Sequence, residues 1–187
     1  GNRNLVAQFQ GQSCYIATPS NPSNGGTTSG NGLYHFGETC TVTATPATGY
    51  EFSNWTDNGS VASTEVAYTF TVGSGRNLVA NFAVQTFQIT ATVEPAEGGT
   101  AIGGGTYNYG DMVTIEVDTN EDWAFLNWTE NGSVVSEEKS FTFTALEDRH
   151  FVANLEYTEG VGEQNGSQTL IYPNPVNDKL TIEAQEA

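Results

Sequence analysis

The amino-acid sequence repeats itself after 73 residues, and this limits the chain to folds that can be built twice in tandem. The phrase NWTDNGS at residues 54–60 returns as NWTENGS at residues 127–133. Residues 12–82 align with residues 85–155 without a gap, and about 28 of the 71 aligned residues are identical. A unit of this length exceeds the solenoid repeats that fold only as a stack, so we predict two independent small domains.

A shorter match extends the repeat towards the beginning of the chain. RNLVANF at residues 76–82 aligns with RHFVANL at residues 149–155 and with RNLVAQF at residues 3–9. We therefore interpret the first residues as the last strand of a preceding unit. The predicted boundaries are residues 1–11 for that strand, 12–83 for the first repeat domain and 84–156 for the second.

Within each unit, hydrophobicity alternates with a period of two residues, which is typical of β-strands. FQITATVEP at residues 87–95 and MVTIEVDT at residues 112–119 show this alternation, and the glycine-rich segment between them predicts a hairpin. Asn-Gly pairs at residues 58–59 and 131–132 predict tight hairpin turns, because both residues tolerate positive φ. We expect a mostly β fold with about five or six short strands in each unit.

The chain is strongly acidic, with 5 Lys and Arg residues against 22 Asp and Glu residues and a net charge of −17. It cannot neutralise phosphates, so we expect no nucleic-acid partner. No apolar run reaches the roughly 18 residues of a membrane helix, so we expect no membrane insertion. We also expect the segment to be monomeric. The equivalent residues Arg3, Arg76 and Arg149 are each expected to pair with an acid on a neighbouring strand or at the junction between units.

The sequence offers no constellation of residues typical of catalysis. His35 and His150 lie 115 residues apart at non-equivalent positions of the two units, where the aligned residues are Asn108 and Asn77, so we expect surface residues rather than a shared catalytic site. No His or Cys cluster has the spacing of a zinc site. TDNGS contains a single carboxylate, Asp57, which we expect to cap a turn rather than to bind calcium. We therefore predict that the chain is not an enzyme and has no catalytic residue, no cofactor and no metal site.

The aromatic residues of the repeated phrase allow two interpretations. Trp55 and Trp128 could be exposed and stack on a ligand, which makes them the best candidate ligand contacts. Alternatively, Phe52 and Trp55 anchor a thin core, as aromatic residues do in small domains. Strict alternation places residues 52 and 55 on opposite faces of a strand, so a shared core requires a bulge. We favour the core interpretation.

Two cysteines occur only in the first unit. Cys14 and Cys40 align with Phe87 and Val113, which alternation places on the inward faces of strands. One unit has thus exchanged two apolar side chains for two cysteines together, which suggests a paired change. We predict a disulfide between Cys14 and Cys40; the alternative is a pair of buried free thiols.

Several motifs recur in the same order in both units and resemble the bacterial InlB B-type repeat in its divergent form. They are Gly-Gly-Thr, Tyr-x-x-Gly, Phe-x-x-Trp and the closing Val-Ala-Asn-Phe, which is Val-Ala-Asn-Leu in the second unit, and the resemblance covers residues 12–156. It implies a β-grasp-like fold and non-catalytic spacers or weak interaction modules of surface proteins. The first unit departs from the second at TPSNPSNGGT, residues 18–27, where we expect the first strand to end early, at Pro19.

The C-terminal segment has a different composition. Residues 157–168 are polar and contain glycine, which is typical of a linker. IYPNPVNDKLTIEA at residues 171–184 resembles the opening of the C-terminal sorting domain of the Bacteroidetes type IX secretion system. Residues 169–187 are therefore interpreted as the truncated start of that domain, a β-strand tail. The resemblance implies export to the extracellular space or the outer-membrane surface, where disulfides persist.

These observations predict a non-catalytic structural or interaction segment, such as a stalk, a spacer or an adhesin-like module, of an exported bacterial cell-surface protein. Candidate partners are a host or matrix protein or a glycan. Two alternatives stay open: accessory modules of a larger secreted enzyme such as a protease, and a carbohydrate-binding repeat pair. An upstream catalytic domain would favour the first alternative. Glycan binding that is lost on Trp55→Ala or Trp128→Ala would favour the second.

Overall fold

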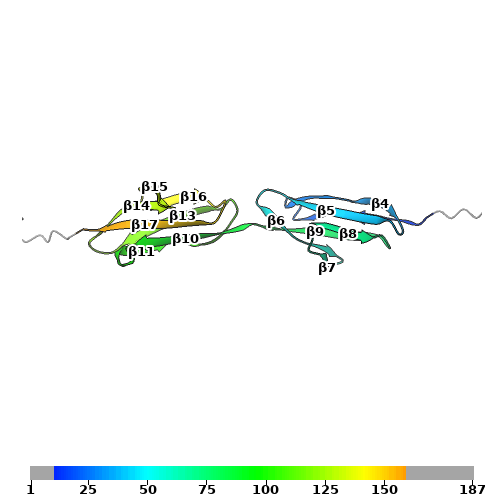
Figure 1. Ribbon diagram of the computed structural model, residues 1–187, viewed down its shortest axis with the longest axis horizontal. Helices are drawn as coiled ribbons and strands as arrows, with labels where there is room; N and C mark the ends of the chain where they lie inside the picture. Colours follow the sequence, from blue (N-terminus) through cyan, green and yellow to red (C-terminus); the bar gives the residue numbers. More distant parts are fainter. Residues whose placement is uncertain (1–10, 159–187) are drawn as a thin grey trace, which may run out of the picture.

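The computed structural model describes residues 11–158, which form two β domains placed end to end (Figure 1). The first domain runs from Ser13 to Val84 and the second from Thr86 to Tyr157, and in this part of the chain the single helical segment is the 3₁₀ turn η1 (Ala96–Gly98). The expected mostly β fold with two tandem repeat domains is confirmed. Nearly all of the predicted preceding strand, the linker and the sorting segment lies outside the described residues.

The second domain consists of a larger and a smaller sheet. The larger sheet contains β10 (Thr86–Glu94), β12 (Gly105–Asn108), β14 (Trp123–Glu130), β15 (Ser133–Ser136) and β17 (Arg149–Tyr157). The smaller sheet contains β11 (Gly99–Ile102), β13 (Met112–Thr119) and β16 (Ser140–Thr144). The orders are β12-β10-β17-β14-β15 and β11-β13-β16. The first and last strands, β10 and β17, are parallel neighbours in the middle of the larger sheet, which fits the expected β-grasp-like fold.

The first domain has the same arrangement. Its strands are β1 (Ser13–Ala17), β2 (Ser20–Asn21), β3 (Gly26–Ser29), β4 (Gly32–His35), β5 (Thr39–Pro46), β6 (Tyr50–Asp57), β7 (Ser60–Ser63), β8 (Ala67–Thr71) and β9 (Arg76–Val84). The larger sheet has the order β4-β1-β9-β6-β7, with β2 also paired to β9, and the smaller sheet has the order β3-β5-β8. The gapless sequence match therefore corresponds to a common topology.

The parallel ladder between the first and last strands differs between the domains. In the second domain, six consecutive residues of β10 pair with β17. In the first domain, only Ile16 and Ala17 of β1 pair with β9, and pairing resumes at Ser20 and Asn21. The strand thus ends just before Pro19, as predicted, because proline cannot donate to a ladder.

The glycine-rich segment does not form the predicted hairpin. β10 and β13 lie in different sheets, and the segment between them forms β11, which pairs with β13, and β12, which pairs with β10. Gly103 lies at the crossing with a φ of 94°, where an added Cβ would lie 2.2 Å from the Thr114 carbonyl oxygen. Only glycine fits such a close backbone approach. Gly30 marks the same crossing in the first domain. The two domains have nine and eight strands, rather than the expected five or six, because short segments such as this one form strands of their own.

Both sheets contribute one face to a shared core. Along β13, Val113, Ile115 and Val117 are buried, whereas the residues between them are exposed, as the alternation predicts. The most deeply buried large side chains of the second domain are Trp128, Phe151, Ile89, Ile115 and Val113, and those of the first are Trp55, Ile16, Leu78, Val42, Val72 and Cys40. Equivalent positions thus fill both cores, which explains why they recur in the sequence.

A single residue, Gln85, joins the two domains. Its backbone N–H donates to the carbonyl of Gly49 in the first domain (2.9 Å), and its carbonyl accepts from the N–H of Tyr109 in the second (2.8 Å). The Tyr109 ring packs against Gly49 so closely that an added Cβ would lie 2.4 Å from ring atom Cδ1. The two domains thus follow one another with almost no linker, and Figure 1 shows them in line.

Candidate functional site

The repeated phrase forms the end of β6 or β14 and the turn that follows. The pairing of β6 with β9 shifts by one residue between Phe52 and Asn54. This bulge places Phe52 and Trp55 in the same core, with 5.7 Å between the ring centroids. The same irregularity in β14 leaves 5.9 Å between the ring centroids of Phe125 and Trp128. The bulge that the core interpretation requires is therefore confirmed.

Trp55 and Trp128 are core anchors in the structure. Both are 0% exposed. The Trp55 indole N–H donates to the carbonyl of Val66 (3.4 Å), and the Trp128 indole N–H donates to the carbonyl of Lys139 (3.3 Å). Neither ring presents a face to solvent, so the structure does not support the hypothesis that Trp55 and Trp128 contact a ligand.

The polar residues of the phrase have structural partners as well. Asn58 and Gly59 have φ values of 48° and 82°, and they form the predicted hairpin turn between β6 and β7. Asn81 of β9 donates through its side chain to Asn54 Oδ1 (2.9 Å) and Thr56 Oγ1 (3.1 Å). The equivalent bonds recur in the second domain. The phrase thus recurs because a strand end, its side-chain bonds and its turn recur.

The acid of the phrase pairs with the arginine that begins the last strand. Arg76 Nε donates to Asp57 Oδ2 (2.7 Å), and Arg149 donates to both carboxylate oxygens of Glu130 (2.8 and 2.5 Å). Arg149 also lies 4.8 Å from the ring centroid of Phe143. The expected pairing of Arg76 and Arg149 with acids on neighbouring strands is confirmed. Asp57 was expected to cap a turn; its Oδ1 accepts a hydrogen bond from the side chain of the turn residue Asn58 (3.3 Å), but the ion pair of its Oδ2 with Arg76 was not predicted. The sequence held the signal, since acid and arginine lie 19 residues apart in both units.

The pair of Glu130 and Arg149 should make the second domain sensitive to acid. Hydrogen bonds from Arg149 lower the pKa of Glu130, whereas burial opposes that shift. A carboxyl group with a lowered pKa stabilises the fold above its unfolded-state pKa, near ~4.3, and this contribution is lost as the pH falls through the folded-state pKa. We therefore expect the melting temperature of the second domain to decrease as the pH is lowered through this range.

Glu130→Gln should make the stability less dependent on pH. It should also lower the free energy of unfolding by about 1 kcal/mol at pH 7, a modest loss because the ion pair is partly exposed to solvent. Scanning calorimetry between pH 7 and pH 2 measures both effects. The exposed Glu137 provides the control, and Glu137→Gln should retain the wild-type profile. Equal acid sensitivity in Glu130→Gln and the wild type would contradict the assignment.

Cys14 and Cys40 lie on opposite sheets of the first domain. Cys14 is in β1, where it faces Tyr34 across the β1–β4 pair, and Cys40 is in β5. A hydrogen bond with Cys40, together with burial, raises the pKa of Tyr34, so both cysteines lie beside the same tyrosine. Both contact the same core, and in the structure both are free thiols. The disulfide therefore stays a prediction.

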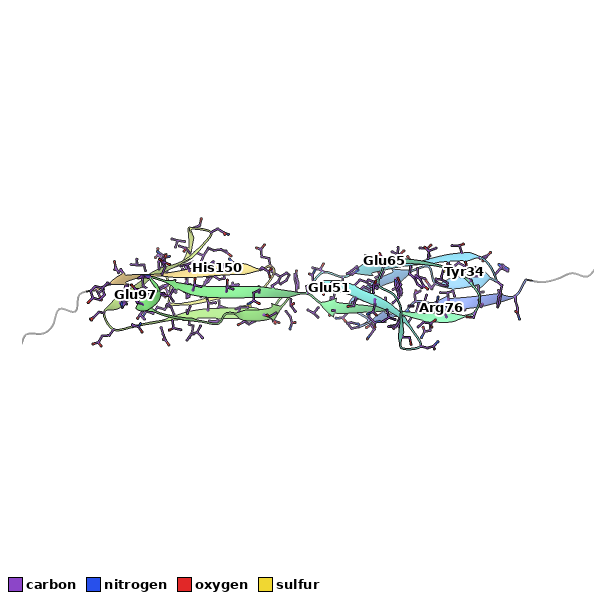
Figure 2. All side chains as sticks on the ribbon, turned by 60° about the horizontal axis from the view of Figure 1, so that its bottom comes forward. Tyr34, Glu51, Glu65, Arg76, Glu97 and His150 are labelled. Carbon is purple, nitrogen blue, oxygen red and sulfur yellow. The ribbon has the colours of Figure 1, made fainter. Side chains whose placement is uncertain are left out.

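The two histidines lie on the surface of different domains. His35 is 3.3 Å from a Glu38 oxygen, and His150 Nδ1 is 2.6 Å from Thr90 Oγ1. Figure 2 shows His150 on the second domain, away from the labelled Tyr34 of the first. Within residues 11–158, no group of three or more His, Cys, Asp or Glu residues is placed to hold a metal ion. Nor does any helix of that region have the length and apolar character that a membrane crossing requires.

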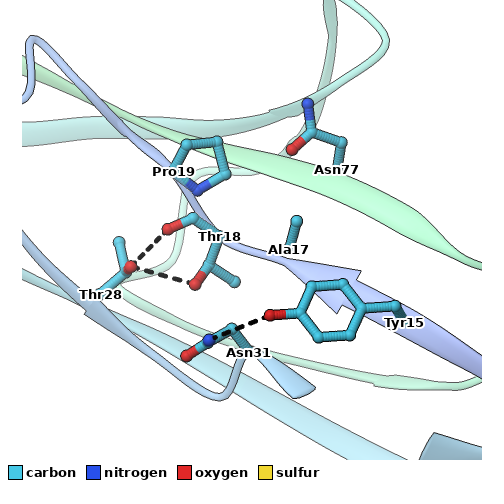
Figure 3. A pocket seen from close by; sticks show the side chains of 7 residues that line it. All are labelled: Tyr15, Ala17, Thr18, Pro19, Thr28, Asn31 and Asn77. Atoms are coloured by element: carbon cyan, nitrogen blue, oxygen red, sulfur yellow. Dashed lines mark hydrogen bonds between the residues drawn. The ribbon is translucent and has the colours of Figure 1, made fainter. Parts of the chain in front are cut away.

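A hollow of about 400 Å³ opens on the first domain where the ladder between β1 and β9 is interrupted (Figure 3). Tyr15, Ala17, Thr28, Asn31 and Asn77 are among the residues that line it. No motif in the sequence marks these residues as a site. The available signal was an outward-facing tyrosine in a strand that a proline ends early.

Fold and contacts together define a tandem array of small two-sheet β domains, whose most strongly repeated residues form the core, turns and ion pairs. The family described as "Divergent InlB B-repeat domain" matches residues 16–86 and 89–159. These matches cover more than half of the chain, and the chain belongs to this family.

Other comparisons add little. No curated protein matches the chain. Among solved structures, the Bacillus anthracis TIE protein is similar to it with 11% sequence identity and a TM-score of 0.39, over 78% of this chain and 34% of that one. The chain thus spans about a third of the length of that protein. A likeness at this level supports no statement about function.

Proposed function

We propose that the two domains act as a non-catalytic spacer and interaction segment of an exported cell-surface protein. The observation that supports the spacer role best is the joint at Gln85, where one residue is hydrogen-bonded to both domains. The Tyr109 ring fills the space beside Gly49, so the joint is packed as well as short. A joint of this kind restricts bending between neighbouring domains, because motion would break backbone hydrogen bonds and expose apolar surface.

The same joint geometry recurs at the outer ends of the pair. Gln12, which is equivalent to Gln85, accepts a hydrogen bond from the Phe36 N–H (3.0 Å). Thr158, which is also equivalent to Gln85, donates to the Asp122 carbonyl (2.6 Å). Each domain thus presents one half of a joint at either end. Such domains can be stacked in a row at a fixed spacing, which suits a spacer.

The stiffness of the joint can be measured with spin labels on Val61 and Val134, which are 63% and 57% exposed on equivalent hairpins. The labels would be attached to cysteines introduced by Val61→Cys and Val134→Cys in a Cys14→Ala, Cys40→Val background. We expect one narrow distance distribution. Insertion of Gly-Ser-Gly-Ser after Gln85 should broaden it strongly, because a flexible linker replaces the packed joint. If the uninterrupted chain gave a distribution as broad as that of the insertion variant, the spacer proposal would be abandoned.

The surface location rests on different support. The segment at residues 171–184 resembles a type IX sorting signal, and it lies outside the described residues. Divergent InlB B-repeat membership fits such a location, because the resemblance first noted in the sequence implies modules of surface proteins. Antibody labelling of intact source cells tests this part of the proposal. Labelling only after lysis would contradict it.

A further inference from the structure

The ring of Tyr15 lies on the surface of the first domain, outside its hydrophobic core. Alternation along β1 buries Ile16 and points Tyr15 outward, where it is 52% exposed. Its cross-strand neighbour on β4, Leu33, is 74% exposed. Single exposed apolar residues are common on protein surfaces. Tyr15 becomes informative because an apolar neighbour and a hollow lie directly beside it.

Uncharged polar groups surround this hollow. Asn31 Nδ2 donates to the Tyr15 hydroxyl (3.4 Å), which holds the edge of the ring and leaves the amide oxygen of Asn31 as an acceptor. Figure 3 shows Asn31 and Asn77 on opposite sides of Ala17. Among the hydrogen bonds of residues 11–158, none involves the Asn77 side chain. None of the lining residues is charged, although the chain has a net charge of −17.

The second domain closes the same face with its own hydrogen bonds. The equivalents of Tyr15, Ala17, Leu33 and Asn77 are Gln88, Thr90, Thr106 and His150. The Thr106 hydroxyl donates to Gln88 Oε1 (3.0 Å), and Thr90 Oγ1 lies 2.6 Å from His150 Nδ1. The parallel ladder also continues there without a break. At these equivalent positions, the exposed aromatic ring and the asparagine side chain without a hydrogen bond, Asn77, therefore occur in the first domain and not in the second.

We propose that this hollow binds a neutral carbohydrate, with Tyr15 as the stacking platform. The apolar face of a tyrosine matches the C–H face of a sugar ring, while its hydroxyl stays available for hydrogen bonding. The Asn31 and Asn77 side chains each offer a donor or an acceptor, as neighbouring sugar hydroxyls require. An open hollow with a few convergent polar groups suits a small uncharged ligand. The acidic surface disfavours anionic sugars.

The test uses the whole 187-residue chain and affinity gel electrophoresis against hydroxyethylcellulose, xylan, mannan, laminarin and soluble starch. We expect at least one of these polysaccharides to retard the protein. Tyr15→Ala should raise the dissociation constant at least tenfold, Asn77→Ala should raise it several-fold, and Tyr15→Phe should retain most binding because the ring remains. The matched control is Gln88→Ala in the second domain, which should bind like the wild type.

Thermal unfolding by circular dichroism must show that Tyr15→Ala keeps the wild-type fold, which is expected because its ring is outside the core. The proposal is overturned if none of the polysaccharides retards the protein, or if Tyr15→Ala and Gln88→Ala bind equally. A peptide library that competes at Tyr15 more strongly than the sugars would also overturn it. The outcome does not depend on the joint at Gln85, so the spacer proposal stands or falls separately.

Discussion

Replacing Trp128 with alanine should lower the free energy of unfolding of the second domain by about 3–5 kcal/mol. The ring is 0% exposed and packs against Phe125, and its N–H satisfies the Lys139 carbonyl. Alanine leaves a cavity and removes a partner from that carbonyl, and both changes destabilise. Small domains are stable by only about 5–15 kcal/mol, so much of the domain's stability should be lost. Urea unfolding followed by circular dichroism measures the change.

The same hairpin offers a matched control for this substitution. Val134 follows the turn after Trp128 and is 57% exposed, so Val134→Ala should change the stability by no more than about 0.5 kcal/mol. Trp55→Ala should reproduce the large effect in the first domain, because Trp55 has an equivalent place in that core. A loss below about 1 kcal/mol for Trp128→Ala would contradict the role of the ring as a core anchor.

Formation of the predicted bridge between Cys14 and Cys40 should stabilise the first domain by about 3 kcal/mol relative to its reduced form. The bridge would close a loop between β1 and β5 and join the two sheets of the domain. Its main effect would be to restrict the unfolded chain. The second domain contains neither cysteine, so its unfolding should not respond to reducing agent.

Thiol titration of the unfolded, unreduced protein decides whether the bridge forms. We expect no free thiol after exposure to an oxidising buffer and two after reduction. The control is the double variant Cys14→Ala, Cys40→Val, which takes valine from the equivalent Val113 and whose stability should be independent of redox conditions. Two free thiols under oxidising conditions would end the disulfide hypothesis.

The sequence predicted best those features that depend on neighbouring residues. The Asn58-Gly59 turn follows from local φ preferences, and the bulge beside Phe52 follows from two aromatic residues that alternation alone cannot place in one core. The role of Asp57 was missed, because its partner Arg76 lies on another strand and is not visible from local turn chemistry. Hydrophobic periodicity predicts where strands lie and which face is buried, but it does not predict which distant strands pair with each other.

The same limit explains the two other differences. The glycine-rich segment reads locally as a hairpin, but its strands pair with different sheets because Gly103 lets the backbone pass close to Thr114. The hollow beside Tyr15 exists only after folding, when Asn31 and Asn77 arrive from separate strands and loops. Alternation could place Tyr15 on the outside, but it could not show which side chains would surround it.

The parallel pairing of first and last strands has a mechanical consequence. In each domain the chain enters along one strand and leaves along its parallel neighbour, so a pull on the two ends shears the ladder between them and loads its bonds together. That ladder is continuous over six residue pairs in the second domain but is split into two short parts in the first. Resistance to forced unfolding is governed by the unfolding rate. Under tension the first domain is therefore the weaker element, and it would extend and absorb load before the second domain gives way.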